Sequence, residues 1–369
     1  MQSVLPLVSF IVPFTERSYL PFDARLSLLL TELCSLANCE VILHVTGVIS
    51  DKYSQVIRQL ESSLVVVQQV KSDNDTYSAG QARNHAVTVA KSDYIFFIDA
   101  DLAVAPELFS QLKARVHKLA TIGPFAFEMY PCLYLSQQAT VNFKSDFNAY
   151  LDSFMQGHND MAEGIALASS CLLLNRNWFL QLGGFDIEFI GHGGEDFGLI
   201  HKLCLHYPIS SFPADYADNI KGQHPGGYLG CRRYFSLYAL QHLFEGRFLV
   251  HLWHSRPLTH HYHKRRVVND KLLSDKLRQV RLIQQTVTLE STNSLQASCK
   301  VTGKVVADLN ANFTSWMESN QIQNGYPIEN YPGLFKWADN VVIKRTFRRK
   351  LRKLYLKPIL FFKDMVFKT

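Results

Sequence analysis

The chain has 369 residues, of which 47% are hydrophobic and 19% charged, a composition typical of about two globular domains. This excludes a mainly disordered chain, and because no apolar run approaches the roughly 18 residues of a membrane span, we expect neither a transmembrane helix nor a signal peptide. The net charge of +6 is uneven: residues 344–369 hold ten Lys or Arg and one Asp, which leaves −3 for the remainder. A near-neutral body argues against nucleic-acid binding.

The seven cysteines form no CxxC pair, which favours a reducing cytoplasm as the compartment of the protein.

Strands and helices are predicted to alternate through the first hundred residues. The predicted strands lie at 7–13, 41–45, 64–70 and 94–98, and the predicted helices at 23–37, 54–62 and 79–90. This order indicates an α/β fold with a mostly parallel sheet flanked by helices, which binds ligands beyond the carboxyl ends of its strands. Residues 222–230 are expected to form a mobile glycine-rich loop. From residue 257 the chain turns polar, basic and helix-like, so we place a domain boundary near residue 258.

The strand at 94–98 is followed by two acids, Asp99 and Asp101, spaced so that both carboxylates leave the strand on one side. Such a pair can hold a hard divalent cation, which in turn can bind the pyrophosphate of a nucleotide. An isolated Asp-x-Asp is more often part of a turn or a helix cap. The apolar strand before it favours the metal site.

Two further segments contain residues suited to a ligand. Residues 79–85 begin a helix in which backbone amides and Arg83 are predicted to face a phosphate or ribose, although a solvated surface arginine fits the same pattern. Residues 183–198 combine many glycines with Glu195 and Asp196 at the start of a helix. The glycines allow the backbone to approach a ligand or to close as a lid, and an ordinary acidic helix start is the alternative.

Five histidines follow between residues 251 and 263. No cysteine lies near them and there is no HExxH motif, so a structural zinc site is poorly supported. One of these histidines is a candidate to complete the cation site begun by Asp101, since imidazole suits manganese-like ions.

Read together, these motifs resemble the nucleotide-sugar glycosyltransferases of the GT-A fold. The motifs are FIVPFTER from residue 10, GQARN from 80, FFIDADL from 96, GGFDIEFIGHGGEDFG from 183 and LWHSR from 252. The first half is similar to the family-2 type of bacterial capsule and lipopolysaccharide enzymes, and residues 168–203 are similar to the galactosyltransferases. The likeness covers residues 7–258. It implies a GT-A catalytic domain over 1–258, followed by a mainly helical region over 259–369.

The resemblance assigns the donor nucleotide to residues early in the chain. It implies that Pro13, Phe14 and Arg17 border the nucleobase pocket. It also implies that Arg83 lies near the nucleotide. Asp99 is implied to lie beside the ribose, or to contact the metal ligands without binding the metal itself. The base is implied to be uracil, so the donor would be a UDP-sugar.

For the cation, the resemblance implies that Asp101 and His254 ligate Mn²⁺ or Mg²⁺. His251 is a departure, because the galactosyltransferases have a methionine ligand at that position. On a regular strand residues three apart face opposite sides, so both histidines can bind one ion only if residues 251–254 turn.

For catalysis, the resemblance implies that Asp196 is the general base for the acceptor hydroxyl and that Glu195 holds the acceptor. Gly193 and Gly194 would border the donor. His192 departs from the pattern, since the galactosyltransferases have a tryptophan there beside the sugar.

The implied function is an inverting, metal-dependent transfer of a Gal, GalNAc, GlcNAc or GlcA type sugar from a UDP-sugar to a saccharide or glycolipid acceptor, in bacterial capsule or other surface polysaccharide synthesis. A chain of alternating sugars would require a partner glycosyltransferase or one tolerant site, because only one catalytic set is present. Two other functions fit parts of the sequence. They are a haloacid-dehalogenase-like phosphohydrolase that uses the acids at 99 and 101 after the strand at 94–98, and a non-catalytic nucleotide-sugar-binding membrane scaffold.

The tail at 344–369 interleaves its basic residues with aromatic and aliphatic ones. This pattern predicts a peripheral anchor on the anionic cytoplasmic face of the inner membrane. The alternative is a solvated tail that packs on the protein or contacts a partner enzyme.

Overall fold

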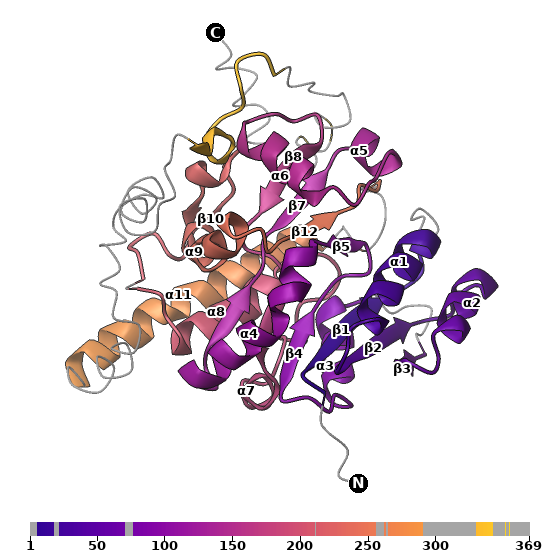
Figure 1. Cartoon of the computed structure of the whole chain (residues 1–369). Coiled ribbons are helices and arrows are strands. Elements are labelled where there is room, and N and C mark those ends of the chain that lie inside the picture. Colours follow the sequence, from indigo (N-terminus) through magenta and orange to yellow (C-terminus); the bar gives the residue numbers. More distant parts are fainter. Residues whose placement is uncertain are drawn as a thin grey trace.

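The computed structural model describes residues 6–17, 22–70, 77–210, 212–255, 262, 265–290, 330–341, 351 and 354 (Figure 1). Its centre is a six-stranded sheet in the order β3-β2-β1-β4-β9-β6. The strands are β1 (Val8–Phe14), β2 (Cys39–Thr46), β3 (Leu64–Gln69), β4 (Tyr94–Phe97), β6 (Phe127–Met129) and β9 (Leu172–Asn175). β1 to β4 are parallel and β9 is antiparallel to both neighbours, so the predicted mostly parallel α/β sheet is confirmed.

Helices cover both faces of this sheet, because alternate residues of β1 enter different cores. Ile11 packs with α3 (Ala79–Val87), while Phe10 and Val12 share a core with α1 (Phe22–Cys34) and α4 (Pro106–Ile122). Every residue of β1 is buried. The almost continuous apolar run in the sequence, broken only by the buried Ser9, is therefore the pattern of a parallel strand covered on both sides.

A second, four-stranded sheet has the order β5-β12-β7-β8. Its strands are β5 (Leu102–Val104), β12 (Leu249–His251), β7 (Cys132–Leu135) and β8 (Ala162–Ala166). β5 begins directly after Asp101, and its antiparallel pairing with β12 sets Leu102 opposite His251. Strand pairing thus brings the acid after β4 beside a histidine 150 positions later in the sequence.

The remaining described elements surround the two sheets. They are α2 (Asp51–Gln59), α5 (Gln137–Val141), α6 (Phe147–Met155), α7 (Arg176–Gln181), α8 (Glu195–His206), β10 (Asn219–Ile220), β11 (Leu229–Gly230), α9 (Cys231–Phe244) and α11 (Arg266–Glu290), with single-turn helices η1 (Pro225–Gly227) and η4 (Pro332–Leu334). α11 packs on α8 although it follows residue 258, and the domain boundary at that residue stays a prediction. Residues 222–230, predicted to be a loop, hold η1 and the whole of β11; that they are mobile stays a prediction.

Three predicted helices need correction. The helix predicted at 23–37 is α1, which ends at Cys34. The helix predicted at 54–62 is α2, which begins three residues earlier at Asp51, an acid suited to a first helical turn. The helix predicted at 79–90 ends at Val87. Within the described part of the chain, no helix is long and apolar enough to cross a membrane. The predicted membrane anchor at 344–369 lies outside the described residues except for 351 and 354.

Candidate active site

A cavity of about 780 Å³ lies where the carboxyl ends of β1 and β4 approach the four-stranded sheet. Its lining includes every catalytic, cofactor-binding and metal candidate from the sequence: Pro13, Phe14, Arg17, Arg83, Asp99, Asp101, Gly193, Gly194, Glu195, Asp196, His251 and His254. Their individual roles stay predictions. Their convergence on one cavity is a property of the fold.

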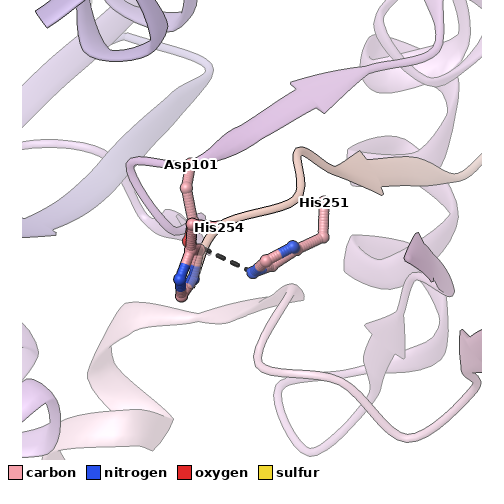
Figure 2. Close-up of side chains that lie close together, drawn as sticks. All are labelled: Asp101, His251 and His254. Carbon is pink, nitrogen blue, oxygen red and sulfur yellow. Dashed lines mark ion pairs between the residues drawn. The ribbon is translucent and has the colours of Figure 1, made fainter. Parts of the chain in front are cut away.

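Figure 2 shows Asp101, His251 and His254 close together, with the two histidines carried by one segment and the acid by another. Each histidine Nε2 lies 3.2 Å from Oδ2 of Asp101. The ligand atoms of all three lie within 4.8 Å of one another, and the side chains are partly buried. Burial alone would raise the pKa of Asp101, but the neighbouring imidazoles hold it well below its usual range.

The turn that this cluster requires is present. β12 ends at His251, so His254 does not occupy a regular strand position on the opposite face. Arg25 of α1 donates hydrogen bonds of 3.2 and 2.7 Å to the carbonyl oxygens of Leu252 and Trp253. A side chain from the first helix thus fixes the turn between the two histidines.

These three residues fit a divalent cation by their donor chemistry, since two imidazoles and a carboxylate suit Mn²⁺ and related ions. Nδ1 of His254 donates to the carbonyl oxygen of Ser255 at 2.8 Å, which leaves the Nε2 lone pair of the neutral ring for a ligand. The N–H of Leu252 donates to the carbonyl oxygen of Asp101 at 3.1 Å. The backbones that carry the ligands are therefore joined directly.

Arg83 lies between two acids of the cavity. Its Nη2 is 2.5 Å from Oδ1 of Asp99 and its Nη1 is 2.9 Å from Oδ1 of Asp196. Ser170 donates to the second carboxylate oxygen of Asp99 at 2.9 Å. Burial alone would lower the pKa of Arg83, but the two carboxylates raise it above its ordinary value. With only 2% of its side chain exposed, Arg83 is not the solvated surface arginine of the alternative interpretation.

Glu195 and Asp196 begin α8 after Gly194, which has a φ of 96°. A Cβ on Gly194 would lie 2.6 Å from the ring of Phe189, so both backbone and packing require glycine there. Glu195 is 5% exposed, and its Oε2 has no hydrogen-bond partner among the described residues. Burial, with Asp196 nearby, raises the pKa of Glu195 to about 8. Burial also raises the pKa of Asp196, in spite of its arginine partner.

Arg17 stacks on two tyrosines that line the cavity with it. Its guanidinium carbon is 3.9 Å from the ring centroid of Tyr262 and 5.3 Å from that of Tyr77. The carbonyl oxygens of Tyr77 and Tyr262 accept hydrogen bonds from the backbone N–H groups of Gly191 and His192, at 3.1 and 2.8 Å. The glycine segment at 191–194 is thereby tied to the same pair of tyrosines.

The other side of this glycine segment packs on α11. Nη1 of Arg266 lies 3.3 Å from Nε2 of His192, and Asn269 donates to the carbonyl oxygens of Ile190 and His192. A Cβ on Gly193, whose φ is 93°, would lie 2.4 Å from Nη1 of Arg266. That this segment closes over a ligand stays a prediction.

Sequence reasoning missed several residues of the site. Tyr77 and Tyr262 gave no signal, because each lies outside the quoted motifs. Arg25 lies in a leucine-rich helix, where a basic residue indicates a solvent-facing position. Arg232 also lines the cavity, and the GYLGCRR run at the start of α9 was the available clue.

Comparison with known proteins identifies a family. Residues 23–279 match the family model described as glycosyltransferase like family 2. No curated protein matches the sequence. Among solved structures, S. aureus TarS 1–349 is similar at 17% identity with a TM-score of 0.36, over 54% of this chain and 55% of that one. TarS 1–349 in complex with UDP gives 16% identity and a TM-score of 0.35, over 53% and 54%. The chain thus spans about half the length of these structures.

Proposed function

Since the chain belongs to the glycosyltransferase-like family 2, and is therefore a sugar-transferring enzyme, we propose that it moves a hexose-type sugar from a UDP-sugar to a saccharide acceptor with inversion at the anomeric carbon. The observation that carries this proposal is the meeting of two sets of groups in one cavity. Asp101, His251 and His254 form a cation-type cluster, and Asp196 supplies a partly exposed carboxylate held by the buried Arg83.

The donor nucleotide is proposed to lie at the carboxyl end of β1, against Pro13, Phe14 and Arg17. This is where open α/β sheets bind nucleotides. The stacking of Arg17 on Tyr262 and Tyr77 holds its guanidinium at that end of the cavity. An orientation fixed before binding reduces the side-chain entropy that is lost when the donor binds.

Asp196 is proposed to remove the proton of the attacking acceptor hydroxyl, a contribution typically worth about 10²–10⁴ in rate. Arg83 holds this carboxylate in place through the 2.9 Å ion pair. Glu195, with an unpartnered oxygen, is proposed to bind a further hydroxyl of the acceptor. A base on the face opposite the leaving group gives a single displacement, so an α-linked donor yields a β-linked product.

Asp101, His251 and His254 would hold Mn²⁺ or Mg²⁺. When bound, such an ion neutralises negative charge that develops on a leaving diphosphate. The residues themselves prepare this site, since Arg25 fixes the turn and Ser255 fixes the His254 ring.

The biological setting is proposed to be capsule or other surface polysaccharide synthesis, with a saccharide or glycolipid as acceptor. The basic tail at 344–369 is proposed to place the enzyme on the cytoplasmic face of the inner membrane. A second glycosyltransferase would be its partner if the product alternates two sugars. Removing residues after about 340 should then release the protein from vesicles that contain anionic lipid.

A panel of nucleotide sugars with Mn²⁺ tests the reaction, with hydrolysis and transfer scored by mass spectrometry. We expect one or a few UDP-sugars to be consumed and other nucleotides to be inert. Phosphate release from generic phosphoesters without nucleotide-sugar dependence would support the phosphohydrolase alternative instead. Donor binding without turnover on any acceptor would support the scaffold.

A further inference from the structure

Three basic side chains line the cavity from elements late in the chain. They are Lys221 directly after β10, Arg232 in the first turn of α9 and Arg266 at the start of α11. Arg266 forms an ion pair of 2.9 Å with Asp270, so its charge is already balanced. The position of Arg232 is different.

Arg232 is held firmly by neutral groups. Its Nε donates to Oδ1 of Asn219 at 3.0 Å, and its guanidinium carbon lies 4.5 Å from the ring centroid of Phe197 and 5.8 Å from that of Tyr228. The hydroxyl of Tyr228 is fixed in turn by a 3.0 Å hydrogen bond to the carbonyl oxygen of Ile165 in β8. The planar guanidinium therefore has a fixed position and orientation in the cavity wall.

No carboxylate balances this charge within the described residues. The next residue, Arg233, makes the contrast plain, because it forms a 2.8 Å ion pair with Asp215. Burial and the nearby Arg266 lower the pKa of Arg232, which shows that the surroundings oppose its positive charge. A partly buried cation without a counter-ion is costly, and a guanidinium in a fixed plane suits bidentate binding of a carboxylate or phosphate.

The location indicates which part of the reactants would supply the anion. Phe197, on which Arg232 stacks, directly follows the proposed base Asp196. The wall that carries Arg232 is anchored to the four-stranded sheet through Tyr228. The nucleoside end, at Phe14, belongs to the six-stranded sheet. A saccharide in contact with the base would therefore lie beside Arg232.

Resting on the proposed function, we propose that Arg232 binds an anionic group of a saccharide substrate, a carboxylate or a phosphate ester, so that the enzyme prefers a negatively charged sugar over its neutral analogue. The anion belongs either to the donor sugar or to the acceptor. The comparison of variants distinguishes these two sources from each other and from the diphosphate of the donor.

The test uses the full chain with Arg232→Gln and with Arg232→Lys. Lysine keeps the positive charge but lacks the paired N–H donors of the planar guanidinium. Arg278→Gln serves as the control, because Arg278 is an arginine on α11 with 68% of its side chain exposed. Donors are compared as a pair, UDP-glucuronate against UDP-glucose. Acceptors are compared as uronate-containing oligosaccharides against the same oligosaccharides after carboxyl reduction. Calorimetry with UDP and Mn²⁺ measures nucleotide binding and folding of each variant.

We expect the unaltered enzyme to favour the acidic member of one pair. Arg232→Gln should lower kcat/KM for that member by about 10–100-fold and leave the neutral member within about threefold, with Arg232→Lys in between. The pair that responds identifies the source of the anion. Binding of UDP should stay unchanged in all variants.

Three results would overturn the inference. If the unaltered enzyme used the acidic and the neutral member of each pair equally well, the proposed preference for an anionic sugar would be wrong, while the proposed transferase function would still stand. Equal losses on both members in Arg232→Gln would indicate a structural role. Weaker UDP binding in that variant would assign Arg232 to the diphosphate. Failure of every donor with the unaltered enzyme, by contrast, would count against the proposed function itself.

Discussion

Arg83 and Asp196 form a 2.9 Å ion pair in the interior of the protein although 113 positions separate them in the sequence. The same guanidinium binds Asp99 at 2.5 Å, so one buried cation holds two carboxylates that would otherwise repel each other across the cavity. An acid at the end of β4 and an acid at the start of α8 are thereby given a fixed separation. The relationship links the proposed nucleotide side of the cavity to the proposed base.

Replacing Arg83 by Met should destabilise the protein and disable catalysis together. The change leaves two carboxylates, 37% and 30% exposed, without their buried cation. Because solvent screens them in part, we expect a cost of about 1–3 kcal/mol, below that of a fully buried pair. We expect the free energy of unfolding, measured with urea, to fall by about that amount at pH 7, and kcat to fall at least about tenfold because Asp196 loses its positioning.

Arg83→Lys is the matched variant. Lysine restores one positive charge, but its single ammonium nitrogen cannot bind both carboxylates as the two terminal nitrogens of the guanidinium do. Stability should therefore recover more than kcat does. If Arg83→Met kept both its stability and its kcat, the double ion pair would have no role in positioning the base.

The two acids at the start of α8 should separate kinetically. Asp196→Asn removes the proposed base and should lower kcat by about 10²–10⁴. Glu195→Gln keeps a hydrogen-bonding side chain and should act mainly on KM for the acceptor. UDP binding should be retained in both variants. Near-normal transfer by Asp196→Asn would show that another group accepts the proton.

The cluster of Asp101, His251 and His254 should make the enzyme depend on a divalent cation. EDTA should abolish transfer and Mn²⁺ should restore it. His254→Ala should weaken Mn²⁺ binding, measured by calorimetry, at least about 100-fold, since even indirect partners of metal ligands contribute 10–100-fold. The exposed His117 on α4 provides a control, because His117→Ala should leave Mn²⁺ binding unchanged.

Arg25→Gln sharpens the same test without touching a ligand. It releases the two carbonyl oxygens of the turn between the histidines and should weaken Mn²⁺ binding about tenfold. Full activity of the enzyme in EDTA would remove the cation from the reaction, whatever these affinities prove to be.

The sequence predicts the parts of the fold that depend on local pattern. β1 and β4 are buried on both sides, so their almost continuous apolar runs mark them as strands. The two acids that follow β4 are identified by their position after such a run. α2 is less well predicted, because Tyr53 is its only fully buried residue among the nine. No apolar residue marks where this helix begins, since Asp51 and Lys52 are exposed and polar, so the predicted start lies three residues late.

Pairings across the fold could not be predicted in this way. Arg25 contacts Leu252 and Trp253, which follow it by 227 and 228 positions in the sequence. Nothing in α1 marks Arg25 as a support for a metal-type site. The family resemblance pointed to Arg83 as a nucleotide neighbour, but its two carboxylate partners follow only from the arrangement of β4, α3 and α8. The roles of Arg25 and Arg83 depend on tertiary contacts, which the periodicity of the sequence does not predict.

Glu195 should make the stability of the protein fall as the pH rises. Its pKa is raised from 4.5 to about 8, chiefly by burial, so between these values the folded state keeps a proton that the unfolded state has lost. The free energy of unfolding should therefore decrease from about pH 4.5 to about pH 8 and level off above, where both states are ionised. Glu195→Gln removes this contribution and should be more stable than the unaltered protein at pH 8.5 by about 4 kcal/mol, with little difference near pH 5. Urea unfolding across this range measures the effect, and the exposed Glu61→Gln should show no such divergence. Parallel curves for Glu195→Gln and the unaltered protein would mean that Glu195 is ionised in the folded state throughout.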